Sequence, residues 1–203
     1  MKNGLPSLKK KKHINLMIVI GITGTLGAGK GTIVEFLKKK YDFAHYSVRA
    51  YLINEIKSRG LEVNRDSMTL VANDLRNNHS PSFIIDEIYK EAAKHSKNCI
   101  IESIRTPGEI DSLKSKSNFY LFAVDADPKL RYERIKIRNS STDNIDFDTF
   151  LANEAREMNT TDPNKQNLSK CIEMADFKFN NNGDLQSLNI EIDKVLNKIN
   201  NNG

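Results

Sequence analysis

The residues with the clearest chemical purpose are the glycines and the lysine between Gly24 and Thr32. They fit the pattern G-x-x-x-x-G-K. Glycines let the backbone curl so that successive N–H groups point inward around an anion, and a lysine adds a mobile positive charge. The pattern predicts a loop that binds the phosphates of ATP, with Lys30 as a catalytic side chain. The expected ATP-binding residues of this loop are Gly27, Ala28, Gly29, Lys30, Gly31 and Thr32.

The flanking segments favour this interpretation over a glycine-rich turn that carries a lysine by chance. Residues 16–22 form an apolar, β-branched run that is typical of a buried parallel strand. Residues 30–40 carry apolar side chains at helical spacing, and a helix start offers unpaired N–H groups to a phosphate. A dinucleotide site is disfavoured because the pattern G-x-G-x-x-G lacks its last glycine here.

Two oxygen-bearing side chains are candidates for a metal, Thr32 and Glu102. Glu102 ends the apolar run 98–101, at a position where a carboxylate can orient the Mg²⁺ that accompanies ATP. The alternative for Glu102 is a helix-capping or surface residue. The sequence thus predicts Mg²⁺ as the cofactor, with ATP as the co-substrate.

Arg105, three residues after Glu102, is the first candidate for gripping the acceptor of the phosphoryl group. A guanidinium suits this role because it binds phosphate oxygens in pairs, so Arg105 is predicted to be both catalytic and substrate-binding. The alternative is an arginine that braces the Glu102 loop. Thr106 is expected to cap the next helix, with Pro107 in its first turn.

Arg131, Arg134 and Arg138 are spaced by three and four residues and share one face of a helix predicted at 128–138. Asp127 is expected to cap this helix. Three arginines on one face would clamp the donor phosphates and stabilise the transferring charge. We expect Arg134 and Arg138 to be catalytic and Arg131 to bind ATP. The alternative is a basic face that is only solvated. This alternative is about as strong as a functional role for Arg131 and weaker than one for Arg134 and Arg138.

Further acceptor contacts are predicted around the second strand and in the helical segment after it. Ser47 and Arg49 stand at the end of the strand expected at 43–47, and Arg76 lies in a predicted helix. Arg65 is an additional candidate, and Asp66 is expected to cap that helix.

The turn after the last strand supplies the final candidates, Asn181 and Gly183. They are predicted to contact the adenine of ATP, and a plain turn is a nearly equal alternative. Three histidines show no spacing that indicates a metal site or a catalytic pair: His45, His79 and His95.

Strands alternate with helices along the chain, which predicts an α/β fold with a five-stranded parallel sheet covered on both faces. The site is expected at the carboxyl ends of the strands. Strands are predicted near 16–22, 43–47, 98–102, 118–124 and 176–180. Helices are predicted near 30–40, 49–59, 66–77, 81–96, 107–116, 128–138, 147–158, 165–174 and 184–199.

The length and composition of the chain limit its domain number, its compartment and its partners. The 203 residues suffice for one domain, expected at 15–203 after a disordered basic tail at 1–14. The absence of an 18-residue apolar run argues against a membrane span. Two cysteines without metal-ligand spacing suit a reducing cytoplasm. The net charge of +5 suits polyanionic substrates. A nucleic-acid partner is disfavoured because no aromatic residues interleave with the basic tail.

Together these motifs resemble an archaeal and bacterial group of P-loop proteins related to dephospho-CoA kinase and adenylate kinase. The likeness rests on G-K-G-T in the loop, the segment I-I-E-S-I-R, the helix D-x-D-P-x-x-R-x-x-R and the ending A-D-(x)4-N-x-G. It implies a three-layer, nucleoside monophosphate kinase-like fold, with residues 49–96 as a substrate-binding helical insertion and 139–165 as a lid. The chain departs from many relatives at residues 47–52, which contain no aspartate.

The sequence therefore predicts an ATP-dependent phosphotransferase whose acceptor is a nucleoside or deoxynucleoside monophosphate. Dephospho-CoA kinase ranks second, because that reaction needs a general base near the second strand and Asp42 precedes the strand. A non-catalytic nucleotide-binding regulatory domain is the third hypothesis. Neither the base preference nor the oligomeric state follows from the sequence.

Overall fold

The computed structural model describes residues 17–140 and 143–202. The basic tail predicted at 1–14 lies outside the described residues, as do residues 141 and 142 of the segment predicted as a lid. Among the described helices, none combines the length and the apolar character needed to cross a membrane.

The centre of the molecule is a five-stranded sheet with the strand order β2-β3-β1-β4-β5, in which every pairing is parallel. This confirms the predicted α/β fold and its strand number. The central strand β1 pairs with β3 on one side and β4 on the other, so that Val19 lies opposite both Cys99 and Phe119. The strands are β1 (Ile18–Gly24), β2 (Ala44–Ser47), β3 (Cys99–Glu102), β4 (Asn118–Asp125) and β5 (Phe177–Asn180).

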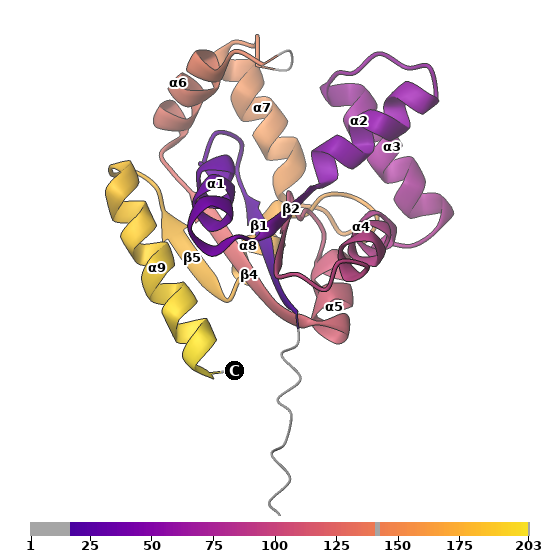
Figure 1. The fold of residues 1–203 in the computed structure, drawn as a ribbon. Coiled ribbons are helices and arrows are strands. Elements are labelled where there is room, and N and C mark those ends of the chain that lie inside the picture. Colours follow the sequence, from indigo (N-terminus) through magenta and orange to yellow (C-terminus); the bar gives the residue numbers. More distant parts are fainter. Residues whose placement is uncertain (1–16, 141–142, 203) are drawn as a thin grey trace, which may run out of the picture.

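Helices cover both faces of this sheet (Figure 1). On one face lie α1 (Lys30–Tyr41) and α9 (Leu185–Asn202), and on the other lie α4 (Phe83–Ala93), α5 (Pro107–Lys116) and α8 (Leu168–Glu173). Beyond the carboxyl ends of the strands stand two further pairs, α2 (Val48–Ser58) with α3 (Arg65–Asn78), and α6 (Pro128–Arg138) with α7 (Phe147–Met158).

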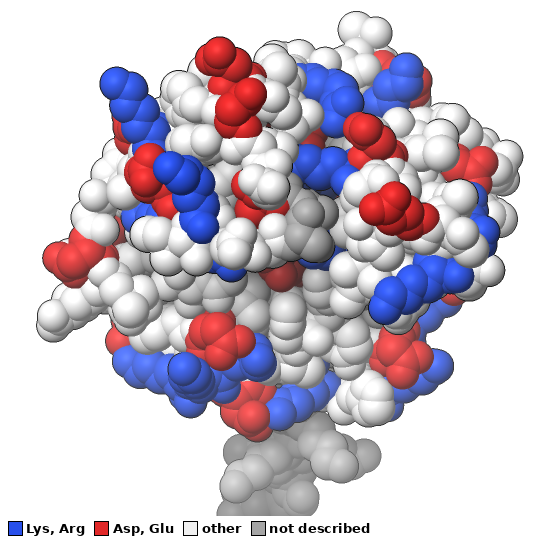
Figure 2. Space-filling model, turned by 90° about the horizontal axis from the view of Figure 1, so that it is seen from above, with Lys and Arg blue, Asp and Glu red and all other residues white. Residues whose placement is uncertain are grey.

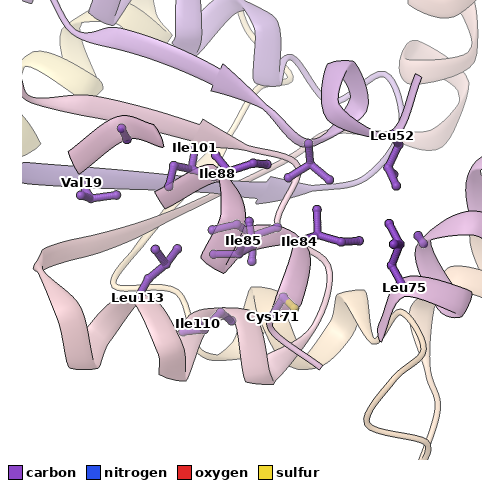
Figure 3. Close-up of a cluster of buried hydrophobic side chains, with 14 of the residues drawn as sticks. Val19, Leu52, Leu75, Ile84, Ile85, Ile88, Ile101, Ile110, Leu113 and Cys171 are labelled. Carbon is purple, nitrogen blue, oxygen red and sulfur yellow. The ribbon is translucent and has the colours of Figure 1, made fainter. Parts of the chain in front are cut away.

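Two apolar cores result from the alternation of side chains along the strands. Val19 of β1 points to the core under α4 and α5, and Figure 3 shows it near Ile88 and Ile101. Ile20 and Ile22 belong to the opposite core, under α1 and α9. Each fully buried side chain of this size stabilises the fold by about 1.5–3 kcal/mol. Cys99 is completely buried in the first core.

The caps explain why several helices begin where they do. Thr106 accepts a hydrogen bond from the Glu109 N–H in a reciprocal capping box, and Asp127 caps α6, so both predicted caps are confirmed. The prediction that Asp66 caps α3 is wrong. Asn64 is the cap, because its extended backbone lets its side chain accept from the Ser67 N–H, and Asp66 instead lies in the first turn.

A buried ion pair joins α3 to α5 below the site. Arg76 donates from Nη2 to Glu109 Oε1 at 2.9 Å, and the two side chains are 2% and 0% exposed. Glu109 Oε2 also accepts from the backbone N–H groups of Arg105 (2.7 Å) and Thr106 (3.1 Å). One buried carboxylate therefore fixes both Arg76 and the start of the Arg105 segment.

We expect Glu109→Gln to lower the free energy of unfolding by about 3–5 kcal/mol, because it leaves the Arg76 charge buried without its counter-ion. Urea denaturation measures the loss. The control is Glu191→Gln, an exposed position on α9, which should change stability by less than about 0.5 kcal/mol. Equal stability of the two variants would contradict the assignment.

Candidate functional site

The loop between β1 and α1 has the backbone that an anion-binding loop requires. Gly27 and Gly29 adopt φ angles of 79° and 107°, in the left-handed region that favours glycine. A Cβ atom at Gly27 would collide with the carbonyl of Arg131, and one at Gly29 with the side-chain amide of Asn181. The loop is therefore curled tightly against its neighbours, and larger residues do not fit at these two positions.

Lys30 folds back over this loop. Its Nζ donates to the carbonyl oxygens of Gly24 and Thr25, each at 2.8 Å. Burial, together with the nearby charge of Arg105, lowers the pKa of Lys30 to about 7. Near neutral pH this amine is therefore poised between its neutral and charged forms, and an approaching polyphosphate would favour the charged one.

Two side chains from elsewhere in the chain donate hydrogen bonds to carbonyl oxygens of the loop. Asn181 donates from Nδ2 to the Ala28 carbonyl at 2.8 Å. Arg131 donates from Nη1 to the Leu26 carbonyl at 3.2 Å and forms a two-pronged ion pair with Glu154 of α7. These contacts hold the carbonyl oxygens of Leu26 and Ala28 in place.

A cavity of about 640 Å³ opens beside the loop, at the carboxyl ends of β1 and β3. Figure 2 looks onto this end of the molecule and shows basic and acidic side chains interspersed around it. Seven basic side chains and two carboxylates line the cavity. They are Lys30, Arg49, Arg65, Arg76, Arg105, Arg134, Arg138, Glu102 and Glu157.

Glu102 is positioned by a histidine that the sequence did not single out. His45 of β2 lies 3.2 Å from Glu102 through Nε2, although no spacing along the chain pointed to this pair. Burial favours a higher pKa for Glu102, but the hydrogen bond with His45 and the charge of Lys30 outweigh it and lower the pKa. The carboxylate is therefore ionised and suited to a cation.

The oxygen donors near the loop fit Mg²⁺, which prefers hard oxygen ligands and keeps part of its water shell. Thr32, in the first turn of α1, and Glu102 both line the cavity. Within residues 17–140 and 143–202, no cluster of three or more His, Cys, Asp or Glu side chains forms a metal cage. A metal here would depend on phosphate oxygens as well as on protein.

Two arginines of the cavity, Arg105 and Arg65, converge on an acidic residue that was not predicted, Glu157. Arg105 Nη1 pairs with Glu157 of α7 and lies 3.2 Å from Gln166 Oε1. Arg65 Nη1 lies 3.5 Å from the same carboxylate. Arg76 borders the same cavity. Burial favours a higher pKa for Glu157, but the charges of Arg105 and Arg65 outweigh it and lower the pKa.

Arg134 and Arg138 reach the cavity from α6. Arg134 donates from Nη2 to the Asn181 carbonyl at 2.9 Å. Arg138 makes a bidentate pair with Asp143, at 2.7 and 2.8 Å. Sequence reasoning missed Asp143, which is five residues from Arg138 and has a side chain only 1% exposed. This carboxylate fixes the direction of the Arg138 side chain.

Five predicted site residues lie outside the cavity lining. Ala28 is completely buried within the phosphate loop. Ser47 caps α2 by accepting from the Ala50 N–H at 3.3 Å. Gly183 is exposed, with open space where a side chain would stand. Arg131 and Asn181 are buried and contact the loop from behind. Their assigned roles stay predictions, and the geometry adds loop support as a role for Arg131 and Asn181.

Comparison with known proteins places this geometry in context. The model of the AAA domain family matches residues 23–150. UPF0200 proteins from Methanocaldococcus jannaschii and Methanococcus maripaludis are each 29% identical. They match over 92% and 90% of this chain and over 92% and 98% of their own lengths. The structure of TT1252 from Thermus thermophilus aligns with a TM-score of 0.61 at 16% identity, over 90% of this chain and 97% of that one. Shikimate kinase from Bacteroides thetaiotaomicron aligns with a TM-score of 0.57 at 13% identity, over 89% and 99%.

We expect ATP binding to draw a proton onto Lys30. The pKa of about 7 in the empty site leaves the amine mostly neutral at pH 8, and the phosphates raise this pKa, so binding at that pH should take up about one proton. Isothermal titration calorimetry in buffers of different ionisation enthalpy measures the uptake. It should vanish at about pH 5, where the free amine is already charged.

Lys30→Arg is the matched variant, because a guanidinium stays charged at these pH values and has no proton to gain. Proton uptake at pH 8 that is the same in this variant and in the wild type would exclude Lys30 as its source.

Proposed function

This chain belongs to the AAA domain family, and from that premise we propose that it is an ATP- and Mg²⁺-dependent phosphotransferase. The acceptor in this proposal is a small phosphorylated compound of the nucleotide type, a nucleoside or deoxynucleoside monophosphate. The observation that carries the proposal is the single cavity that joins the phosphate loop to arginines from four other segments of the chain.

Charge complementarity supports two phosphorylated ligands. Seven basic and two acidic side chains line the cavity, and Glu109 and Asp143 pair with two of its arginines from outside the lining. Positive charge is still in excess, which is costly to bury unless anions neutralise it. Phosphoryl transfer depends on positioning and on neutralising the charge that spreads over the transferring group. A cavity of this charge suits that task better than covalent or acid–base chemistry.

In this proposal the two ends of the cavity have different roles. Lys30 and the loop N–H groups hold the donor phosphates, and Arg134 and Arg138 approach the same phosphates from α6. Arg105 and Arg76 hold the phosphate of the acceptor at the other end. Mg²⁺, when bound, neutralises the charge of the donor phosphates, and Glu102 orients its water shell.

The wall between α2 and α3 supports a nucleotide-type acceptor. Val48, Leu52, Met68 and Ala72 line the cavity beside the arginines, and an apolar surface next to cations suits a flat base attached to a phosphate. Arg49 lies on the same wall, with Nη1 3.4 Å from the Met68 sulfur. Residues 49–96 thus serve as the acceptor-binding insertion in this proposal.

Residues 139–165 serve as the lid. Asp143 holds Arg138, and Glu154 and Glu157 of α7 pair with Arg131 and Arg105. Two of these contacts join the segment to arginines of the cavity lining, and the third joins it to Arg131 behind the loop. Movement of the segment would therefore open or close the cavity and exclude water during transfer.

We expect acceptor-dependent release of ADP with at least one nucleoside or deoxynucleoside monophosphate. Arg105→Ala should lower kcat/KM for that acceptor by about 100-fold, because it removes charge at the acceptor phosphate. The Kd for MgATP should change by less than about threefold, because the loop is left intact. A coupled ADP assay and calorimetry measure the two quantities, and dephospho-CoA is included among the acceptors.

The matched control is Arg156→Ala, because Arg156 is half exposed on α7 and does not line the cavity. It should leave both quantities unchanged. Tight MgATP binding without turnover on any of these acceptors would instead favour a nucleotide-binding regulatory domain, and turnover confined to dephospho-CoA would favour the second hypothesis.

A further inference from the structure

The carboxylate of Glu157 stands among the basic side chains at the acceptor end of the cavity. It pairs with Arg105 and lies 3.5 Å from Arg65, and its own side chain is only 13% exposed. The two arginines come from the segment after β3 and from the start of α3, and Glu157 comes from α7. Three separate segments of the chain therefore meet at one buried negative charge.

The same end of the cavity has more donors than Glu157 can satisfy. Arg76 is 2% exposed and uses Nη2 for Glu109. Its Nε and Nη1 atoms are buried, and so is Nε of Arg65, yet none of the three has a hydrogen-bond partner within the described residues. Buried donors are rarely left unpaired in folded proteins. Unpaired donors in the lining of the cavity that Glu157 also lines indicate a site for an anion with more oxygens and more charge than one carboxylate.

We propose that Glu157 occupies the place of the acceptor's phosphate in the empty pocket and thereby selects which acceptors bind. This inference rests on the proposed function, because it concerns the acceptor end of the same cavity. On binding, the phosphate oxygens replace the carboxylate beside Arg65 and Arg105 and reach the unpaired nitrogens of Arg76. Glu157 moves away toward solvent with the last turn of α7.

This exchange favours one chemical class of acceptor. A phosphate monoester carries close to two negative charges and three acceptor oxygens at neutral pH, so it forms more charge-assisted hydrogen bonds than the single carboxylate that it replaces. A monocarboxylate only matches what it displaces. An uncharged hydroxyl compound would leave the arginines without a counter-ion. The pocket therefore selects phosphomonoesters over sugars and simple carboxylic acids.

Glu157 also connects acceptor binding to the lid. One turn earlier on α7, Glu154 holds Arg131 behind the phosphate loop. The helix is thus tied at Glu154 to the donor side and at Glu157 to the acceptor side. When the acceptor's phosphate replaces Glu157 beside Arg65 and Arg105, the contact of α7 with the acceptor side is broken.

The test compares the affinity of the wild type and of Glu157→Gln for inorganic phosphate. Phosphate is titrated at constant ionic strength, with and without Mg²⁺ and the non-hydrolysable analogue adenylyl imidodiphosphate, which keeps phosphate out of the loop. Calorimetry gives Kd, and thermal unfolding gives an independent measure. Removing the internal competitor should tighten phosphate binding by about tenfold in the presence of the analogue.

Two further arms keep the result interpretable. Glu173→Gln changes the same charge at an exposed site paired with Lys170, and should bind phosphate as the wild type does. Acetate should stabilise Glu157→Gln and leave the wild type unchanged. Glu157→Asp, whose shorter side chain withdraws from the arginines, should lie between the two and serves if the glutamine variant does not fold.

Unchanged or weaker phosphate binding by both Glu157 variants would overturn the inference, and weaker binding would show that Glu157 orients the arginines for the acceptor. Failure of this inference can be distinguished from failure of the proposed function. Failure of the nucleotide analogue to bind the wild type would count against the phosphotransferase, whereas the comparison made without nucleotide would still decide the role of Glu157.

Discussion

The site depends on how the carbonyl oxygens of the loop after β1 are held. A curled loop can present its N–H groups to an anion only if its carbonyl groups have partners elsewhere. Lys30 occupies those of Gly24 and Thr25, Asn181 occupies that of Ala28, and Arg131 occupies that of Leu26. The loop is therefore shaped before any ligand arrives, and little ordering cost remains for binding.

The arginines around the cavity are likewise held by partners within the protein. Burying a guanidinium is costly unless a counter-ion accompanies it, and this protein provides internal carboxylates for most of those around the cavity. Glu109 holds Arg76, Asp143 holds Arg138, and Glu157 holds Arg105. Two of these acids come from the segment between α6 and α8. That segment thus contributes negative charge to an otherwise basic cavity, and this explains why no uniformly basic surface surrounds the site (Figure 2).

Much of the architecture could be predicted because it depends on local patterns. An apolar, β-branched run predicted the first strand, the alternation of strands and helices predicted four more, and Thr106 and Asp127 were recognised as caps by residue type and position. Asp66 was misassigned because several residues near that helix start can act as caps, and only the backbone angles decide that Asn64 does so. The helix predicted at 165–174 begins later, at Leu168, where Asn167 accepts a hydrogen bond from the Lys170 N–H.

The sequence by itself determined the phosphate loop, the parallel sheet behind it and the arginines at the ends of the strands, because glycine placement, strand patterning and helical spacing act over short distances along the chain. Only the tertiary structure decided which acid accompanies which base. His45 meets Glu102 across two neighbouring strands, and Glu157 meets Arg105 across 52 positions of sequence. Such pairs follow from burial, because a charge removed from water takes the nearest opposite charge in space, wherever the chain supplies it.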